Sequence, residues 1–256
     1  MQQYFINRSD LNPGDLVTLS ADDSHHIVRV MRGREGDKLG IIGGQQRFDG
    51  QIERITDDLL VEAVILERLA VEYYDIELPV EVTIACGLSK NDKLDTIVQK
   101  ATECGMSHFI PLAMKRDIVQ WTTKKSQAKI ERLAKIAKGA AEQSHRLHIP
   151  TIDALMTLPQ LLEKAVAYDV ILVAYEETAK EGQHAVLAEV VEQLTPGQKV
   201  LVVFGSEGGL DPSEIQTLTG AGFKTCSLGP RILRAETAPI YLLSALSFGL
   251  ELQKNK

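Results

Sequence analysis

The segment VLVVFGSEGGLDPSE (residues 200–214) joins an apolar run to a glycine-rich loop and then to the start of a helix. The unbroken apolar run is typical of a strand buried on both faces of a parallel sheet. Asp211 is a good N-cap, Pro212 suits the first helical position, and Glu214 completes a capping box. The segment therefore predicts a strand–loop–helix unit whose loop lies at the carboxyl edge of a parallel sheet, where α/β proteins bind ligands.

The same alternation of apolar runs and helical patterns extends from residue 80 to the end of the chain. We expect strands at 82–86, 109–113, 170–174, 200–204 and 223–228. We expect helices at 94–104, 127–144, 158–165, 185–193, 212–220 and 239–253. This alternation predicts an α/β domain with a parallel sheet covered on both faces.

The first part of the chain has a different pattern, with short strands separated by turns. These strands are expected at 16–19, 39–42, 48–55 and 59–66, with one short helix at 24–31. Many short strands within some 70 residues favour a small β-barrel. We therefore expect two domains, residues 1–72 and 73–256.

The chain has 256 residues, of which 44% are apolar and 25% charged, as in ordinary globular proteins. Its net charge of −7 argues weakly against a nucleic-acid partner. However, residues 115–148 hold nine basic and three acidic side chains, a local charge of +6, whereas residues 153–192 carry −6. The basic segment is either a solvated helix face or a surface that contacts phosphates.

The number of cysteines and the hydropathy of the chain bear on the cellular compartment in which the protein is expected. Cys86, Cys104 and Cys226 are too widely spaced for a metal site, and an odd, sparse set favours a reducing, cytoplasmic location. The longest apolar stretch, 239–250, is too short and too interrupted by serine to span a bilayer, and no secretory signal is visible. The tandem His25 and His26 have no third ligand nearby, which favours a structural or RNA-contacting role over a metal site. We expect no metal and no membrane contact.

A second candidate loop, LGPRILRAETAP (residues 228–239), follows the strand expected at 223–228. We expect Thr237 to cap the last helix. The segment 173–177 ends a neighbouring strand and is expected to complete the same pocket. The charged side chains of the loop form either a surface ion pair or a ligand site, and their place at the sheet edge favours the ligand site. These side chains are Arg231, Arg234 and Glu236.

The two loops, GSEGG (205–209) and LGPRILRAETA (228–238), in this order, resemble those of the SPOUT superfamily of S-adenosylmethionine-dependent RNA methyltransferases. The closer resemblance is to its RsmE-type branch, which methylates N3 of a uridine in small-subunit ribosomal RNA. Further matches are K-x-x-E-x-G at 100–105, E-Q-S-x-R at 142–146 followed by Pro150, and the set His26, Val30, Arg32, Gly36 and Asp37. Departures from the family pattern are Ser206 in place of proline, Gly43 in place of aspartate, and Gln3 in place of arginine.

The resemblance implies a PUA-like RNA-binding β-barrel (1–72) and a SPOUT α/β domain (73–256) with a C-terminal trefoil knot. It also implies a homodimer that binds S-adenosylmethionine at the subunit interface and acts on ribosomal RNA or the small ribosomal subunit. The cofactor-binding residues would be Ala174, Tyr175, Glu176, Gly205, Glu207, Gly209, Leu228, Gly229, Ile232, Leu233, Arg234, Thr237 and Ala238. The RNA-binding residues would be Arg29, Arg32, Lys100, Arg116, Gln143 and Arg146.

Arg234 and Glu236 are the expected catalytic residues. Arg234 would stabilise the negative charge that develops on the uracil oxygens, and Glu236 would either orient Arg234 or accept the N3 proton. Two alternatives stay open, namely a methyltransferase of this superfamily with another RNA target and a non-catalytic RNA-binding factor in ribosome assembly. A nucleotide-dependent oxidoreductase is disfavoured because the loop lacks the G-x-G-x-x-G spacing.

Overall fold

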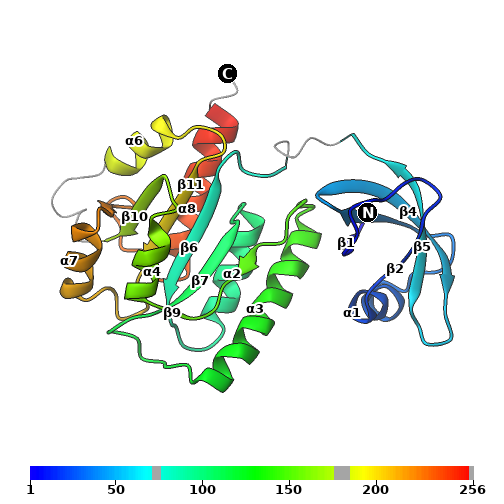
Figure 1. Ribbon diagram of the computed structural model, residues 1–256, viewed down its shortest axis with the longest axis horizontal. Helices are drawn as coiled ribbons and strands as arrows, with labels where there is room; N and C mark the ends of the chain where they lie inside the picture. Colours follow the sequence, from blue (N-terminus) through cyan, green and yellow to red (C-terminus); the bar gives the residue numbers. More distant parts are fainter. Residues whose placement is uncertain (71–75, 176–184, 254–256) are drawn as a thin grey trace. The chain divides into compact units, whose positions relative to one another are not determined.

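The computed structural model describes residues 1–70, 76–175 and 185–253, and the chain divides into two compact units (Figure 1). The first unit comprises Met1–Glu77 together with Ala141–His148, and the second comprises Leu78–Ala140 together with Ile149–Lys256. A division into two parts was expected. The sequence did not predict that a short later segment, Ala141–His148, packs with the first unit. A single domain boundary along the sequence does not reveal such a contact.

The first unit is built on one curved sheet with the strand order β1-β3-β4-β5-β2. Strand β1 pairs in parallel with β3, and the other neighbours are antiparallel. The four strands expected from the sequence are present, whereas β1 is too short to have a recognisable pattern. The strands are β1 (Gln3–Phe5), β2 (Leu16–Thr18), β3 (Lys38–Gly43), β4 (Gln46–Ile55) and β5 (Val61–Arg68).

Two short helices occupy the place of the single helix expected at 24–31, so that prediction is wrong in its start and type. The first, α1 (Ala21–His25), begins early because the Ser20 hydroxyl accepts a hydrogen bond from the amide of Asp23. The second, η1 (His26–Val30), is a π-helix that ends where the Met31 amide donates to the His26 carbonyl. The wider turn is a local feature that apolar periodicity does not encode.

The core of the first unit is formed by side chains of the sheet strands together with those of the π-helix and the connecting segments. Alternate residues of each strand point inward, and these side chains are almost completely buried. The principal members are Tyr4, Leu39, Ile41, Phe48, Ile52, Val61, Ala63 and Ile65, with Ile27 from the π-helix.

A buried ion pair ties the end of the first unit to the segment Ala141–His148. The Glu77 carboxylate accepts hydrogen bonds from the Arg146 guanidinium (Nε, 2.9 Å) and from the amides of Leu147 (2.8 Å) and His148 (3.1 Å). Glu77 is 2% exposed and Arg146 is 3% exposed. The side chain of Gln3, itself fully buried, donates to the Arg146 carbonyl oxygen (2.7 Å). These contacts explain why residues 141–148 belong to the first unit.

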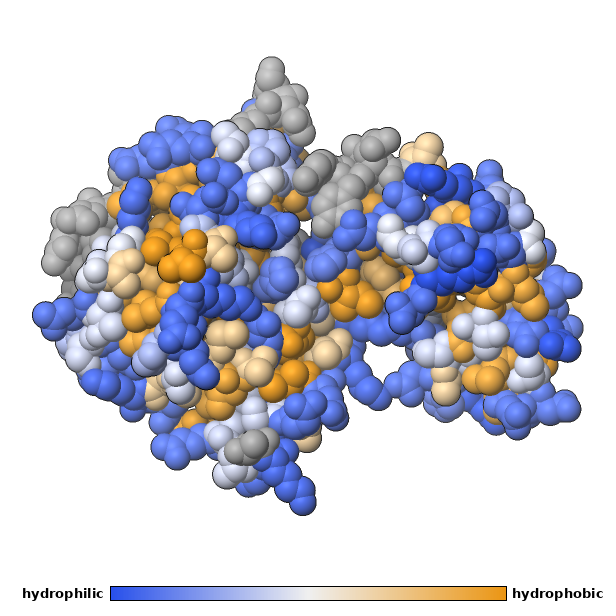
Figure 2. Space-filling model, in the orientation of Figure 1, coloured by the Kyte–Doolittle hydropathy of each residue, from blue (hydrophilic) through white to orange (hydrophobic). Residues whose placement is uncertain are grey.

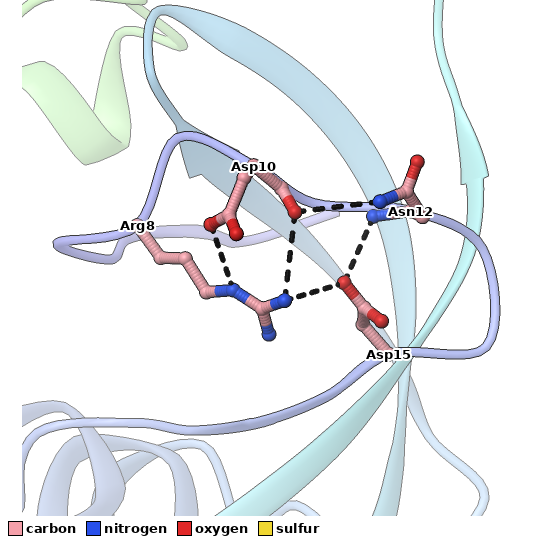
Figure 3. A network of polar contacts seen from close by, with 4 residues as sticks. All are labelled: Arg8, Asp10, Asn12 and Asp15. Atoms are coloured by element: carbon pink, nitrogen blue, oxygen red, sulfur yellow. Dashed lines mark hydrogen bonds and ion pairs between the residues drawn. The ribbon is translucent and has the colours of Figure 1, made fainter.

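An exposed polar network organises the loop between β1 and β2 (Figure 3). The Arg8 guanidinium donates to the carboxylates of Asp10 (3.0 Å) and Asp15 (2.8 Å), and the Asn12 amide also donates to Asp15 (3.0 Å). Because the network is open to solvent, each ion pair contributes less than about 1 kcal/mol.

The second unit is a parallel sheet with the order β12-β10-β11-β6-β7-β8, and β9 also pairs with β7. Its register aligns Phe204 with Cys86 and Ala174 with Cys226, so the carboxyl ends of these strands meet at one edge. The strands are β6 (Glu81–Gly87), β7 (His108–Ala113), β8 (Thr151–Ile152), β9 (Met156–Thr157), β10 (Val170–Ala174), β11 (Lys199–Phe204) and β12 (Lys224–Cys226). The short β8 and β9 were not expected.

Helices cover both faces of this sheet, as expected. Val200 and Val202 point to the face covered by α2, α3, α6 and α8, while Leu201 and Val203 point to the face covered by α4 and α7. The helices are α2 (Lys93–Glu103), α3 (Thr123–Gln143), α4 (Leu158–Ala165), α6 (Ala185–Gln193), α7 (Pro212–Gly220) and α8 (Thr237–Ser247). The last expected helix, 239–253, is divided, because its final part is a π-helix, η3 (Phe248–Gln253).

Hydrophilic residues cover much of the visible surface, and apolar residues form small patches between them (Figure 2). Within the described ranges, no helix combines the length and the apolar character needed to cross a membrane.

Replacing Arg146 with alanine should lower the free energy of unfolding of the first unit by about 3–5 kcal/mol, because it leaves the Glu77 carboxylate buried without its cation. Urea unfolding followed by circular dichroism measures this change. The matched control is Arg8→Ala, which removes an exposed arginine from the same unit and should cost less than about 1 kcal/mol. Equal losses in the two variants would contradict the structural role of the buried pair.

Candidate functional site

A cavity of about 860 Å³ opens at the carboxyl edge of the second unit's sheet. Its walls are the segments that follow β10, β11 and β12, together with the first residue of α2 and the loop after β7. The parallel register places these segments side by side, as the sequence predicted. Predicted cofactor residues that line the cavity are Ala174, Tyr175, Gly205, Glu207, Gly209, Leu228, Gly229, Ile232, Leu233, Arg234 and Ala238.

The glycine loop after β11 folds tightly back on itself. The amide of Gly209 donates to the carbonyl of Ser206 (2.9 Å), and the two residues form an isolated antiparallel bridge. A Cβ atom on Gly205 would lie 2.8 Å from the carbonyl carbon of Gly209, which is closer than real Cβ atoms approach. Gly209 has φ of +71°, a region that favours glycine. The loop therefore needs glycine at both ends, and its backbone faces the cavity.

The helix after the glycine loop begins as the sequence predicted. The Asp211 carboxylate accepts from the amide of Ser213 (3.0 Å), and the Glu214 carboxylate accepts from the amide of Asp211 (2.9 Å). The expected capping box is therefore confirmed. Glu214 also accepts from the amide of Lys115 (2.8 Å), which joins the loop after β7 to the start of α7.

The second loop ends in a turn that leads into α8. The carbonyl oxygen of Arg234 accepts hydrogen bonds from the amides of Thr237 (2.9 Å) and Ala238 (3.0 Å). The expectation that Thr237 caps α8 is wrong, because Glu236 occupies the N-cap position and makes no capping hydrogen bond with its side chain. Thr237 is the first residue of α8 and does not line the cavity.

Charged side chains surround the mouth of the cavity. Lys93, at the first residue of α2, lies 3.3 Å from the Glu207 carboxylate and 3.5 Å from that of Glu236 (Nζ to Oε). Arg116 lines the cavity and lies 3.5 Å from the Asp211 carboxylate. Partial burial opposes ionisation of Glu207, but backbone amides, including that of Lys90, and the Lys93 ammonium outweigh it and lower the pKa of Glu207. Glu207 is therefore ionised near neutral pH.

Cys226 contributes the thiol that lines the cavity. Burial raises the pKa of Cys226 to about 12, so the thiol stays protonated. Within the described residues, no group of three or more His, Cys, Asp or Glu side chains could hold a metal ion. The His26 ring lies 3.0 Å from the buried Tyr4 hydroxyl (Nδ1 to Oη), which is a structural contact.

The expected RNA-binding residues are distributed over both units. Arg29 and Arg32 are exposed in the first unit, and Gln143 is exposed in its later segment. Lys100 lies on α2, where it pairs with Glu103. Arg146 is buried against Glu77, so it has no free surface for a phosphate and we leave it out of the proposed RNA-binding surface. The expected cofactor residue Glu176 lies outside the described residues.

Sequence reasoning missed Lys93. Arg116, which the sequence assigns to RNA binding, also lines the cavity. The signal for Lys93 was available, because it follows the strand expected at 82–86 and therefore lies at the same sheet edge as the two loops.

Comparison with known proteins gives two family matches. Residues 76–247 match the model of the RNA methyltransferase domain, and residues 19–66 match that of the RNA methyltransferase PUA domain. The chain is 41% identical to ribosomal RNA small subunit methyltransferase E of Bacillus subtilis, covering 98% of both chains. It is 31% identical to the protein of the same name from Synechocystis, covering 92% of this chain and 74% of that one.

Among solved structures, the chain is similar to ribosomal RNA small subunit methyltransferase E from Neisseria gonorrhoeae bound to S-adenosyl methionine. The identity is 25%, the TM-score is 0.82, and the match covers 96% of this chain and 97% of that one.

The geometry of the glycine loop leads to a test on ligand affinity. Gly205→Ala places a Cβ against the backbone of Gly209 and should weaken S-adenosylmethionine binding at least about tenfold, or ~1.4 kcal/mol, in calorimetric titration. The control is Gly139→Ala, since a Cβ there meets nothing within 4 Å. A folded Gly205→Ala variant with unchanged affinity would show that the closed loop does not shape the site.

Proposed function

Because the chain belongs to the RNA methyltransferase family, with that family's PUA domain preceding the methyltransferase domain, we propose that it methylates N3 of a uridine in small-subunit ribosomal RNA. The full-length match to small subunit methyltransferase E of Bacillus subtilis carries this proposal. The cavity bounded by the two motif loops supports it from the structural side.

The residues at the cavity fit S-adenosylmethionine. The cavity volume of about 860 Å³ lies in the usual range for small-molecule sites, about 300–1,000 Å³. Gly208 lets the first loop pack against the loop after β7, since a Cβ on Gly208 would lie 2.6 Å from the Arg116 carbonyl oxygen, and the loop residues Gly205, Gly208 and Gly209 line the cavity. The second loop supplies apolar side chains, Leu228 and Leu233, next to polar backbone groups. We propose that these two loops hold the cofactor.

When bound, S-adenosylmethionine supplies an electrophilic methyl group. Uridine N3 is a weakly acidic imide, so the base must lose its proton before or during attack. Arg234 is exposed at the cavity wall, where its guanidinium can stabilise the negative charge that develops on the uracil oxygens. Glu236 lies two residues further on, where it either orients Arg234 or accepts the proton. The protein therefore contributes mainly alignment and charge stabilisation.

We propose that RNA contacts involve both units. In the first unit, Arg29 and Arg32 are exposed beside Val30 and Met31, which are 61% and 54% exposed. Arginines next to exposed apolar side chains can bind phosphates and pack against bases. In the second unit, α3 has an exposed basic row consisting of Lys124, Lys125, Lys129, Arg132 and Lys135. These groups give a protein of negative net charge a local surface for phosphates.

We further propose that the protein is a homodimer in the cytoplasm, with a trefoil knot formed by its C-terminal segment. Large apolar side chains are exposed near the cavity and along the last helices, which is unfavourable in a monomer. They are Ile232 (79%), Tyr241 (39%), Phe248 (53%) and Leu252 (64%). A second copy that covers them would place its surface beside the methyl-donor cavity.

The main test is Arg234→Ala. This variant should lose about 10²–10³-fold in methyl-transfer rate, because it removes the group that stabilises developing charge, while S-adenosylmethionine binding persists. Mass spectrometry of nucleosides from small-subunit RNA incubated with the protein and cofactor measures 3-methyluridine directly. Undiminished turnover would contradict the role of Arg234, and methylation at another atom or in another RNA would replace the proposed substrate.

The proposed RNA contact of Arg29 and Arg32 is tested by the salt dependence of RNA-binding affinity. The double variant Arg29→Gln, Arg32→Gln should bind RNA more weakly and reduce the slope of log affinity against log salt by about 1.4–1.8, since each lost phosphate contact removes about 0.7–0.9. The control is Arg54→Gln, which removes a 63% exposed arginine of the same unit that pairs with Glu62. Equal slopes for the double variant and the control would contradict an RNA contact at these two arginines.

A further inference from the structure

Lys93 is the cation that lies between the two motif loops. Its ammonium group is 3.3 Å from Glu207 in the first loop and 3.5 Å from Glu236 at the end of the second. The three side chains are only partly exposed, at 33%, 20% and 22%. The Glu236 Oε2 atom is buried and makes no hydrogen bond within the described residues, so the ion pair with Lys93 is its main compensation. Ion pairs this sheltered from water are stronger than those on an open surface.

Lys93 stands on a helix that is packed into the core of the second unit. It is the first residue of α2, whose residues Leu94, Ile97 and Val98 are buried in the core under the sheet. On the outer side, Arg132 of α3 binds the carboxylates of Asp92 and Asp95. These two acids are close to Lys93 in the sequence, but they pair with Arg132. The Lys93 ammonium group instead pairs with Glu207 and Glu236.

We propose that Lys93 is a positioning residue for methyl transfer, which holds the two motif loops in their relative positions and fixes the carboxylate of Glu236 beside Arg234. The proposal rests on the proposed function. Lys93 stands on a packed helix, whereas Glu207 and Glu236 stand on loops. We therefore expect the lysine to position the two loops, and not the reverse. The segment between β6 and α2 contributes one further contact, because the backbone amide of Lys90 donates a hydrogen bond to the Glu207 carboxylate (3.1 Å).

A direct role for Lys93 in binding an RNA phosphate is the competing explanation. The two roles differ in their coupling to Glu207 and Glu236. If Lys93 acts through these two carboxylates, its removal matters little once both have been neutralised. If it binds phosphate, the two losses add.

The experiment compares Lys93→Met, Lys93→Arg and the control Lys90→Met, whose contact with Glu207 is made by the backbone and survives the change. Hydrogen exchange of the ligand-free protein reports on amides in residues 205–210 and 231–238. We expect Lys93→Met to speed exchange in both segments several-fold, Lys93→Arg to restore much of the protection, and Lys90→Met to leave exchange unchanged. Unchanged exchange in Lys93→Met, or no difference between Lys93→Arg and Lys93→Met, would overturn the proposal.

Single-turnover methylation with saturating cofactor provides the second measurement. Lys93→Met should slow the reaction at least about tenfold, and should slow it less than about twofold further in a background that carries both Glu207→Gln and Glu236→Gln. Losses that add in the triple variant would overturn the positioning role and favour a phosphate contact. If the wild-type protein transfers no methyl group to small-subunit RNA, the proposed function fails, while the exchange measurement still decides whether Lys93 holds the loops.

Discussion

The cavity depends on one steric constraint, which is that Gly205 has no side chain. The loop after β11 must reverse within a few residues to leave its backbone facing the cavity, and it does so by bringing Gly209 against Gly205. Any Cβ at Gly205 would force this closure open. The capping box at Asp211 and Glu214 then starts α7 immediately, so the reversal is supported on both sides by regular structure.

The pairing of the strands in the sheet determines where the second loop begins. Strand β12 pairs with β10 so that Cys226 lies opposite Ala174, and the chain leaves both strands at the same edge. The cavity is therefore a consequence of parallel pairing, and the charges around it come from elements that are distant in sequence. The two motif loops form only part of the cavity wall. Lys93 from α2 and Arg116 from the loop after β7 also line it. This arrangement suits a reaction in which the protein supplies alignment and charge.

Much of the second unit could be predicted from its sequence, because a buried parallel sheet needs unbroken apolar strands and helices of regular period. Residues 200–214 show both features and fold as expected. The start of α8 was not predictable in the same way, since Glu236 adopts helical dihedral angles and takes the N-cap position in place of the expected Thr237. The roles of Lys93 and Arg146 could not be predicted for a different reason. Their partners are far away in the sequence, so the pattern shows a basic residue but not whether it faces solvent, a carboxylate or a cavity.

The Glu77–Arg146 pair also determines when the first unit can be completed during synthesis. Its strands have all been translated by residue 68, yet the carboxylate at residue 77 meets its cation only after 69 more residues. At about 5–20 residues per second, a ribosome needs roughly 3–14 s to supply them. In this interval the nascent sheet carries an unmatched anion, while the first strands of the second unit are already emerging. Separate expression of residues 1–77 would make this state permanent, so a stable fragment of the first unit has to include residues 141–148.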